Sequence, residues 1–572
     1  MNNDETLYEA ERFADSIATK FGVFMKKHSA VVLGMTLCCA AQAQTMPDAG
    51  ALRQQIERQQ GENLPPKGLV IPQPAPEPMK ALTGATVTVK SIRFSGNKLL
   101  TSDFLGGVVQ GYLNKPQSFS QLQEVAVAVA TAYREAGWLV RTYLPQQDLT
   151  DGLLTIQIVE AIFSGISLEG PDSDRVKFDQ VADIFEKQQP LGQPVNANAL
   201  DRALLLADDL PGVIVTGNLV AGQTEGETGI DIKLKNEPRA PGEVSLDNTG
   251  SRSTGSERIA GSLFVNSAMG RGESVAVNLV HTSGSDYLRV GVTAPLGSDG
   301  WRVGGNASTL RYKIVSPEFA ALQSQGDSGS FGVEASYPLF RARKRNLYLS
   351  LNYDQKTFHN ESNATVQSDY QSRNASLGLS GNLYDDFAGG GGNSASITLV
   401  SGNLALGSLQ PGENAAREGS FSKLRYNLSR QQALVGELSL FGTLSGQQSS
   451  QPLDSSEKFM LGGSTGVRAY PSSEGSGSTG QLATMELRWR LPQGLTLTGF
   501  YDWGSISNSD TNLGYSLKGV GLGLVWQAPM GTSIKASWAR RLGDNPNPTA
   551  TGMDQDGSLD MNRWWLTASL PF

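Results

Sequence analysis

Arg468 is the first residue of this sequence whose surroundings suggest a specific interaction. It stands in the stretch LGGSTGVRAYPSSEGSGSTG (461–480), where a single cation lies close to apolar Val467 and Tyr470 within a run of glycine and serine. A guanidinium group can hold a carboxylate through two parallel hydrogen bonds, which an ammonium group cannot do. Judged from these neighbours alone, an ion pair and an ordinary solvated loop residue explain Arg468 equally well.

Residue types that support enzymatic chemistry are sparse. Beyond residue 43 the only histidines are His281 and His359, and no serine or cysteine nucleophile motif accompanies them. The glycine-rich segment AGGGGNS (388–394) lacks the Lys-Ser/Thr that follows in a phosphate-binding loop, so a tight turn between strands explains it better. No Cys/His cluster has the spacing of metal ligands. The sequence therefore predicts that the protein is not an enzyme and needs no cofactor and no metal.

Length and charge narrow the class of partner. The chain has 572 residues, enough for several domains, and its formal net charge of −8 argues against nucleic acid, since phosphate binding needs a basic face. No segment reaches the ~18 consecutive apolar residues that a membrane-spanning helix requires. A transmembrane β-barrel would escape that test, because only every second residue of its strands faces lipid.

The segment MKKHSAVVLGMTLCCAAQAQ (25–44) has the pattern of a secretory signal peptide starting at Met25. Two lysines precede an apolar run that ends in Ala-Gln-Ala, so we expect cleavage after Ala43 and a signal region over residues 1–43. A lipoprotein signal is the alternative, but the residue before either cysteine is unfavourable for it. Residues 1–24 are then a signal extension or, as we favour, a misassigned start. Both cysteines, Cys38 and Cys39, fall in the removed segment, so the exported chain would have none.

Residues 48–60 (DAGALRQQIERQQ) have helix-forming composition, with only Ala51, Leu52 and Ile56 as apolar anchors. A helix that is polar on nearly every side cannot dock firmly on an apolar core, so we expect it in water or in a wet cavity. A proline-rich stretch (LPPKGLVIPQPAPEP) follows, which is typical of a stiff, extended linker. We assign residues 44–63 to the helix region and 64–86 to the linker.

Two successive segments, 87–162 and 163–238, repeat the order strand, helix, helix, strand, strand, which predicts two small α+β modules in tandem. In the first, the long helical run SQLQEVAVAVATAYREAG (120–137) opens with Ser120 and Gln123 at capping-box spacing. The run is expected to stop at its final glycine. Its predicted buried stripe recurs at helical spacing and consists of Leu122, Val125, Val129 and Tyr133.

From residue 239 to 572, helical periodicity gives way to alternating segments separated by Gly, Ser, Asn and Asp. In ATMELRWRLP (483–492), apolar and charged residues alternate, which fits a strand with lipid on one side and water on the other. A soluble β-sandwich could bury the same residues. Glycine-lined inner faces and the seven of eight tryptophans in this half favour a membrane barrel instead. We count 16 candidate strands, and the last one ends on Phe572.

Four short motifs add specificity. GWLVRTYLPQQDLTDGLLTIQIVEA (137–161) lies in the first α+β module, and DNTGSRSTG (247–255) lies at the start of the barrel segment. VRAY comprises Val467, Arg468, Ala469 and Tyr470, and FYDWG contains Phe500, Asp502 and Gly504. With these motifs in this order, the chain resembles a two-partner secretion transporter of the TpsB family of hemolysin secretion/activation proteins, in the superfamily of POTRA-bearing barrels that includes BamA. Ala469 departs from the glycine usual in the V-R-G-[FY] motif, which predicts a slightly altered turn.

The resemblance implies a 16-stranded transmembrane β-barrel preceded by two POTRA modules and a plug helix anchored by Leu52 and Ile56. It also implies that a loop between the eleventh and twelfth strands folds into the lumen, where Arg468 pairs with Asp502. Strand parity agrees, because outward Tyr501 and Trp503 leave Asp502 pointing inward. Glu486, inward on the neighbouring strand, is the alternative partner. Inner glycines 519, 521 and 523 would leave room for the loop.

The function implied is transport across the bacterial outer membrane. The POTRA modules, in the periplasm, would bind an unfolded, TpsA-type exoprotein bearing an N-terminal secretion domain, and the barrel would pass it to the cell surface without ATP. Outer-membrane lipid would surround the barrel, and the barrel-assembly machinery would recognise terminal Phe572 during biogenesis. A BamA-like assembly factor, a passive porin and a soluble adhesin or lectin remain the alternatives.

Overall fold

A computed structural model describes residues 48–59, 86–407, 415–508 and 513–572, all within one compact unit that spans Thr45–Phe572. The expected signal region and residues 64–85 of the expected linker lie outside the described residues. Thr86, assigned to the linker, begins strand β1 (Thr86–Thr88). None of the helices in the described ranges is both long and apolar enough to cross a bilayer.

The first α+β module is built on a three-stranded sheet in the order β2-β5-β4. Helix α4 carries the predicted stripe, and all four of its residues are buried. The predicted capping box is wrong by two residues: Ser118 caps the helix and Gln121 completes the box. Both pairs have the same spacing, but the extended backbone that the cap requires occurs at Ser118, the last residue of β3. The elements of this module are β2 (Ser91–Ser95), α3 (Ser102–Val109), β3 (Pro116–Ser118), α4 (Phe119–Glu135), β4 (Val140–Tyr143) and β5 (Leu153–Glu160).

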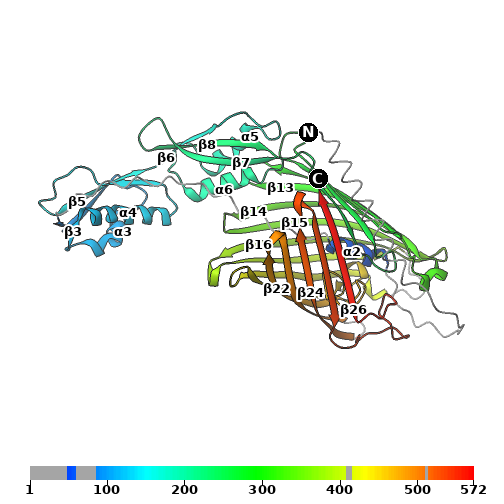
Figure 1. Cartoon of the computed structure of the whole chain (residues 1–572). Helices are drawn as coiled ribbons and strands as arrows, with labels where there is room; N and C mark the ends of the chain where they lie inside the picture. Colours follow the sequence, from blue (N-terminus) through cyan, green and yellow to red (C-terminus); the bar gives the residue numbers. More distant parts are fainter. Residues whose placement is uncertain (1–47, 60–85, 408–414, 509–512) are drawn as a thin grey trace, which may run out of the picture. The chain divides into compact units, whose positions relative to one another are not determined.

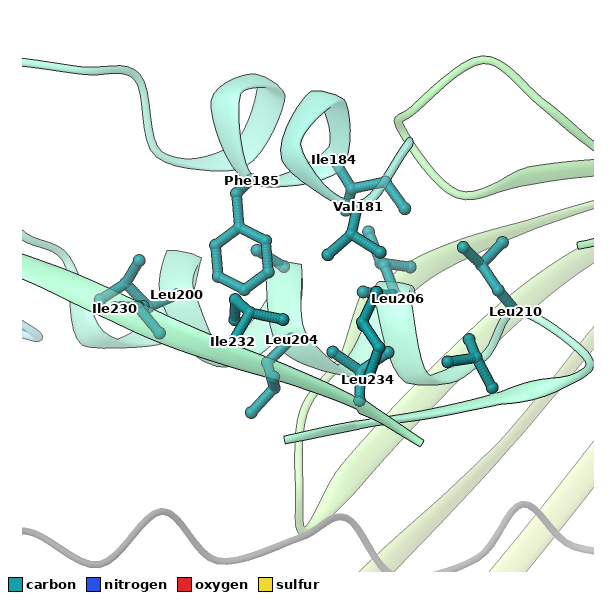
Figure 2. Packing of buried hydrophobic residues seen from close by; sticks show 14 of the residues in the cluster. Val181, Ile184, Phe185, Leu200, Leu204, Leu206, Leu210, Ile230, Ile232 and Leu234 are labelled. Atoms are coloured by element: carbon teal, nitrogen blue, oxygen red, sulfur yellow. The ribbon is translucent and has the colours of Figure 1, made fainter. Parts of the chain in front are cut away.

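The second module has a three-stranded sheet in the order β6-β8-β7, covered by helices α5 and α6. Figure 2 shows its core, in which Phe185 from α5 and Leu204 from α6 lie against Ile232 of the central strand. Strand β6 begins one residue before the boundary expected at 163. The elements are β6 (Ile162–Leu168), α5 (Phe178–Gln188), α6 (Ala197–Asp208), β7 (Val213–Ala221) and β8 (Glu227–Asn236).

Sixteen strands of the described chain close into an antiparallel barrel, which confirms the predicted fold class. Figure 1 shows the wall formed by β22 to β26, and the last strand pairs with the first, β9, to close the ring. The strands are β9 (Gly242–Asp247), β10 (Arg258–Asn266), β11 (Ser274–His281), β12 (Ser285–Leu296), β13 (Trp301–Lys313), β14 (Gln325–Arg341), β15 (Arg345–Ser362), β16 (Thr365–Asp385), β17 (Gly391–Leu406), β18 (Gly419–Ala433), β19 (Leu438–Ser449), β22 (Thr479–Leu491), β23 (Leu495–Asn508), β24 (Leu513–Gln527), β25 (Ser533–Arg541) and β26 (Asn562–Pro571).

The two faces of the wall differ as the alternation predicts. On β22, Met485 and Trp489 are exposed on the outside, whereas Leu482 is buried on the inside. On β23, Tyr501 is exposed and Asp502 is fully buried. An apolar exterior around a polar, filled interior is the pattern of a barrel in lipid.

Helix α2 (Ala49–Gln59) lies among the barrel strands (Figure 1), and its apolar face packs against inward side chains of the wall. Leu52 and Ile56 are only 4% and 7% exposed. The expectation that so polar a helix finds no firm apolar contact is therefore wrong. The reason is that the inner face of the wall carries an apolar patch that includes Tyr287, Leu310, Tyr312, Phe358 and Tyr370.

Candidate functional site

The loop that joins β19 to β22, residues 450–478, is largely buried and contains the short hairpin β20 (Phe459–Met460) and β21 (Ser476–Gly477). We call it the lumen loop. The two strands that the loop joins, β19 and β22, are the eleventh and twelfth of the barrel, as the resemblance implied. Its glycines serve close packing: a Cβ added to Gly466 would lie 1.8 Å from the carbonyl oxygen of Leu461. The glycine-rich sequence thus folds into a compact structure here.

Arg468 lies at the centre of this loop and contacts both candidate carboxylates. Its Nε and Nη2 donate to the two oxygens of Asp502 at 2.9 and 2.8 Å, and its backbone N–H donates to the same carboxylate at 3.1 Å. Its Nη1 donates to Glu486 at 2.8 Å. The two carboxylates, proposed as alternatives, therefore share one guanidinium group. Because the Asp502 side chain is 0% exposed, this pair is shielded from solvent.

The wall around the guanidinium group is shaped to receive it. The Phe500 ring lies beneath it, with 3.4 Å between Cζ and the ring centroid, a cation–π arrangement. The hydroxyl of Thr484 donates to Asp502 at 3.0 Å and satisfies a further oxygen lone pair. Gly504 also faces the loop, because a Cβ there would lie 2.6 Å from a methyl group of Leu461.

Ala469 fits where a glycine was expected because the wall opposite it has no side chain. A Cβ added to Gly519 would lie 2.8 Å from the Cβ of Ala469. Ala469 is not among the residues with positive φ, so alanine needs no strained backbone here. The role expected of the inner glycines is only partly right: Gly521 makes room for the Phe500 ring, and Gly523 meets only ordinary contacts.

Three further residues complete the site, and the sequence analysis missed them. The indole N–H of Trp565, on β26, donates to the carbonyl oxygen of Arg468 at 2.8 Å. Arg541, on β25, stacks over the ring of Tyr470, 4.5 Å from its centroid, and pairs with the buried carboxylate of Asp554. Side chains alternate along β25, so an outward Trp538 could have predicted that Arg541 points inward. No pattern in the sequence indicates a role for Asp554, which lies in a loop.

The histidines lie elsewhere on the barrel. His281 makes an exposed hydrogen bond to Asp286, with 2.7 Å between Nδ1 and Oδ1, and His359 is half-buried on β15. Across the described residues, no group of three or more His, Cys, Asp or Glu side chains could hold a metal ion. The arrangement around Arg468 is suited to holding a loop in place, because all its polar atoms are directed at protein partners.

Comparison with known proteins assigns the chain to a family. The model of the haemolysin secretion/activation proteins ShlB/FhaC/HecB matches residues 226–526, and that of the ShlB-type POTRA domain matches residues 87–161. The chain belongs to this family. Membership confirms the resemblance drawn from the short motifs, and it identifies the protein as an outer-membrane transporter of two-partner secretion with its POTRA modules in the periplasm.

Individual relatives support the same family assignment. The heme/hemopexin transporter protein HuxB of Haemophilus influenzae is 27% identical over 94% of this chain and 97% of its own length. The outer membrane transporter CdiB of Dickeya dadantii is 25% identical over 80% of this chain and 82% of its own. The fold is similar to that of solved CdiB from Escherichia coli, with a TM-score of 0.71 and 21% identity over 93% of this chain and all of that one. BamA from Haemophilus ducreyi is similar in fold, with a TM-score of 0.51 and 16% identity over 85% of this chain and all of that structure.

Proposed function

We propose that this transporter binds one unfolded exoprotein through its periplasmic modules and passes it through the barrel after the plug helix α2 has left the lumen. The observation that carries the proposal is the filled lumen: α2 and the lumen loop are both buried against the inner wall. A chain can pass only if at least one of them moves. The exoprotein is expected to be of the TpsA type with an N-terminal secretion domain.

The edge strand β7 of the second module is the proposed first contact. It spans nine residues at the edge of its sheet, and Thr216 and Asn218 on it are exposed. An extended segment can add to such an edge through main-chain hydrogen bonds, with little demand on its sequence. This mode suits a substrate that arrives unfolded.

Helix α2 is proposed as the removable plug. Besides Leu52 and Ile56, its contacts include Arg53, whose guanidinium group reaches the hydroxyls of Ser308, Ser328 and Ser330 on the wall. Water can replace each of these hydrogen bonds when the helix leaves. Since the periplasm supplies no ATP, transport is driven by successive binding steps and by folding of the exported chain outside.

Biogenesis is proposed to depend on the end of the chain. The Phe572 side chain is 65% exposed, and its backbone pairs with Gly242 through N–H···O bonds of 2.9 and 3.0 Å. An exposed aromatic group at the end of the strand that closes the barrel is suited to recognition by the barrel-assembly machinery. Outer-membrane lipid is the proposed surrounding of the apolar outer face. Absence of enzymatic activity remains a prediction.

Secretion and cross-linking together test the proposal. Depletion should abolish surface appearance of one exoprotein and leave other outer-membrane barrels at normal levels, whereas general barrel loss would favour an assembly factor. Photocross-linkers attached to Thr216→Cys or Asn218→Cys should capture the secretion domain. The matched control is Lys187→Cys, which is exposed on helix α5 of the same module and away from the β7 edge. Equal capture at the control position would contradict binding at the edge.

A further inference from the structure

We infer that residues 454–457, at the root of the lumen loop, form the seat that holds the plug helix, and that Glu457 is the residue that positions this seat. The segment includes a short 3-10 turn, η5 (Ser455–Glu457). We call residues 454–457 the seat turn. The inference rests on the part of the proposed function in which α2 leaves the lumen, and it names a contact that must break when the helix leaves.

The helix packs tightly against the seat turn at Gly50. A Cβ added there would lie 2.8 Å from the Cβ of Ser456, 2.8 Å from the hydroxyl of Tyr370 and 3.0 Å from the hydroxyl of Ser455. Real Cβ atoms do not come so near, and the neighbours cannot retreat because Ser456 and Tyr370 are buried. Gly50 is thus the point at which the helix fits against the turn.

Hydrogen bonds extend this contact along one face of the helix. The hydroxyl of Ser455 donates to the carboxylate of Asp48, at 2.8 and 2.6 Å from its two oxygens. Further along, the Gln54 side chain donates to the carbonyl oxygen of Lys458. Arg58 donates to the carbonyl oxygens of Met460 at 2.6 Å and Thr465 at 3.0 Å. The loop therefore contacts α2 from its first turn to its last.

Glu457 fixes the seat turn to a part of the wall distinct from the Arg468 site. Its carboxylate lies 2.7 Å from the ammonium group of Lys423 on β18 and 3.5 Å from that of Lys356 on β15. Asn374, on β16, donates to it at 2.8 Å. The backbone carbonyl of Glu457 accepts from Lys423 at 2.8 Å and from Gln447 at 2.9 Å.

Burial makes this anchor strong and sensitive. The Glu457 side chain is 5% exposed and that of Lys423 is 3% exposed. Removing the charge of Glu457 would leave two ammonium groups beside a neutral side chain, which is costly at a buried site. A second acid, Asp454, pairs with Arg417 at 2.6 Å, so the turn is held at both ends. Loss of Glu457 would leave the Arg468 contacts intact and release the plug.

Cross-linking in the full-length protein tests the inference without any exoprotein. In a Gln54→Cys/Lys458→Cys background, a short bismaleimide should join the helix to the loop. Gly50→Leu should reduce the cross-linked fraction by about ten-fold, because overpacking a rigid contact is unfavourable. Glu457→Gln should reduce it by a similar factor and should raise the frequency of channel opening in planar bilayers.

Two controls match these changes. Gly442→Leu alters a strand glycine whose added Cβ would meet no atom within 4 Å. Asp386→Asn removes an ion pair with Lys344 in which the two side chains are 88% and 60% exposed. Both should leave cross-linking and channel opening unchanged. Heat-modifiable electrophoresis verifies that each barrel is folded.

An unchanged cross-linked fraction in Gly50→Leu would overturn the inference, and so would an equal loss in the two controls. Because Gly50 lies on the plug helix and is not part of the barrel wall, its variant tests the contact even if Glu457→Gln fails to fold. Secretion plays no part in these measurements, so their failure is distinct from failure of the proposed transport route.

Discussion

At the scale of single residues, the Arg468 site concentrates charge where solvent is largely absent. One guanidinium group faces two carboxylates and one aromatic ring, while Arg488 donates to the second carboxylate at 2.8 Å. Removing one partner from such a buried set typically costs about 3–5 kcal/mol, because the remaining charge stays desolvated. The site should therefore tolerate loss of Arg468 poorly and loss of exposed ion pairs easily.

We predict that Arg468→Ala and Asp502→Asn each destabilise the seated loop and reduce secretion strongly. The loss of secretion in the double variant should be far smaller than the sum of the losses in the two single variants, since the residues contact each other directly. Secretion by Arg468→Lys should lie between that of the unchanged protein and that of Arg468→Ala, because an ammonium group cannot make the paired contacts with Asp502. Secretion of the exoprotein and protease protection of the lumen loop measure these effects.

The charge-swapped pair provides the sharper comparison. Arg468→Asp with Asp502→Arg would place the new carboxylate beside Glu486, so recovery should be partial and should improve when Glu486→Gln is added. Asp386→Asn is the matched exposed control. Additive losses in the double variant would show that Arg468 and Asp502 act independently.

At the scale of elements, the helix and the loop have different means of attachment. Helix α2 combines a small apolar face with side-chain hydrogen bonds, whereas the lumen loop is tied down by buried ion pairs. The hydrogen bonds from Arg53 and Arg58 to hydroxyls and carbonyls contribute about 1.5–3 kcal/mol each, which is less than the roughly 3–5 kcal/mol that breaking a buried ion pair costs. We therefore expect the helix to leave the lumen more readily than the loop.

Deleting residues 48–59 should raise the open-channel conductance in planar bilayers, because the lumen loses one of its two occupants. Replacing Arg53 with Ala should raise the frequency of opening to a smaller extent, since the apolar face of the helix remains. Ala51→Ser, at a half-buried position, is the control. A deletion variant that stays closed would mean that the lumen loop alone blocks the channel.

The sequence predicted much of the fold because lipid imposes a strict alternation. Trp489 and Tyr501 had to face outward, so Glu486 and Asp502 had to face inward, whatever the loops did. It could not predict which inward residues form the contact with the plug, because Tyr287 and Phe358 look the same in sequence whether they meet water or a helix. Glu457 and Asp554 were not predicted for another reason. They lie in loops, where no periodic pattern indicates which way a side chain points.

At the scale of the whole molecule, the second module is tied to the periplasmic turns of the barrel by ion pairs. Arg341, at the end of β14, donates to both oxygens of Asp209 at 2.8 and 2.7 Å, and its side chain is 3% exposed. Arg343 pairs with Asp201 at 2.6 Å. These contacts join the module that is proposed to bind the exoprotein to the channel wall.

Asp209→Ala should loosen this junction by about 1–2 kcal/mol, a buried-pair cost reduced because Asp209 is itself partly exposed. Hydrogen exchange of α6 in the full-length protein should accelerate, and secretion should fall. Glu169→Gln, which removes the exposed pair with Lys233, is the control within the same module. Unchanged exchange in Asp209→Ala would show that apolar packing alone holds the junction.

Phe572→Ala should lower the amount of folded barrel in the outer membrane, because the proposed recognition group is lost while the backbone pairing with Gly242 is kept. The amount of heat-modifiable protein in isolated membranes measures this. Phe340→Ala, at another exposed aromatic of the outer surface, should have little effect.

The hydrogen bond from Trp565 to the carbonyl oxygen of Arg468 determines when, during folding of the barrel, the lumen loop can complete its contacts. Trp565 lies on β26, the sixteenth strand, whose pairing with β9 closes the barrel. The lumen loop therefore cannot complete its set of contacts until the sixteenth strand is in place. A fully seated loop marks a finished barrel, so insertion that stalls before closure would leave the loop accessible to protease.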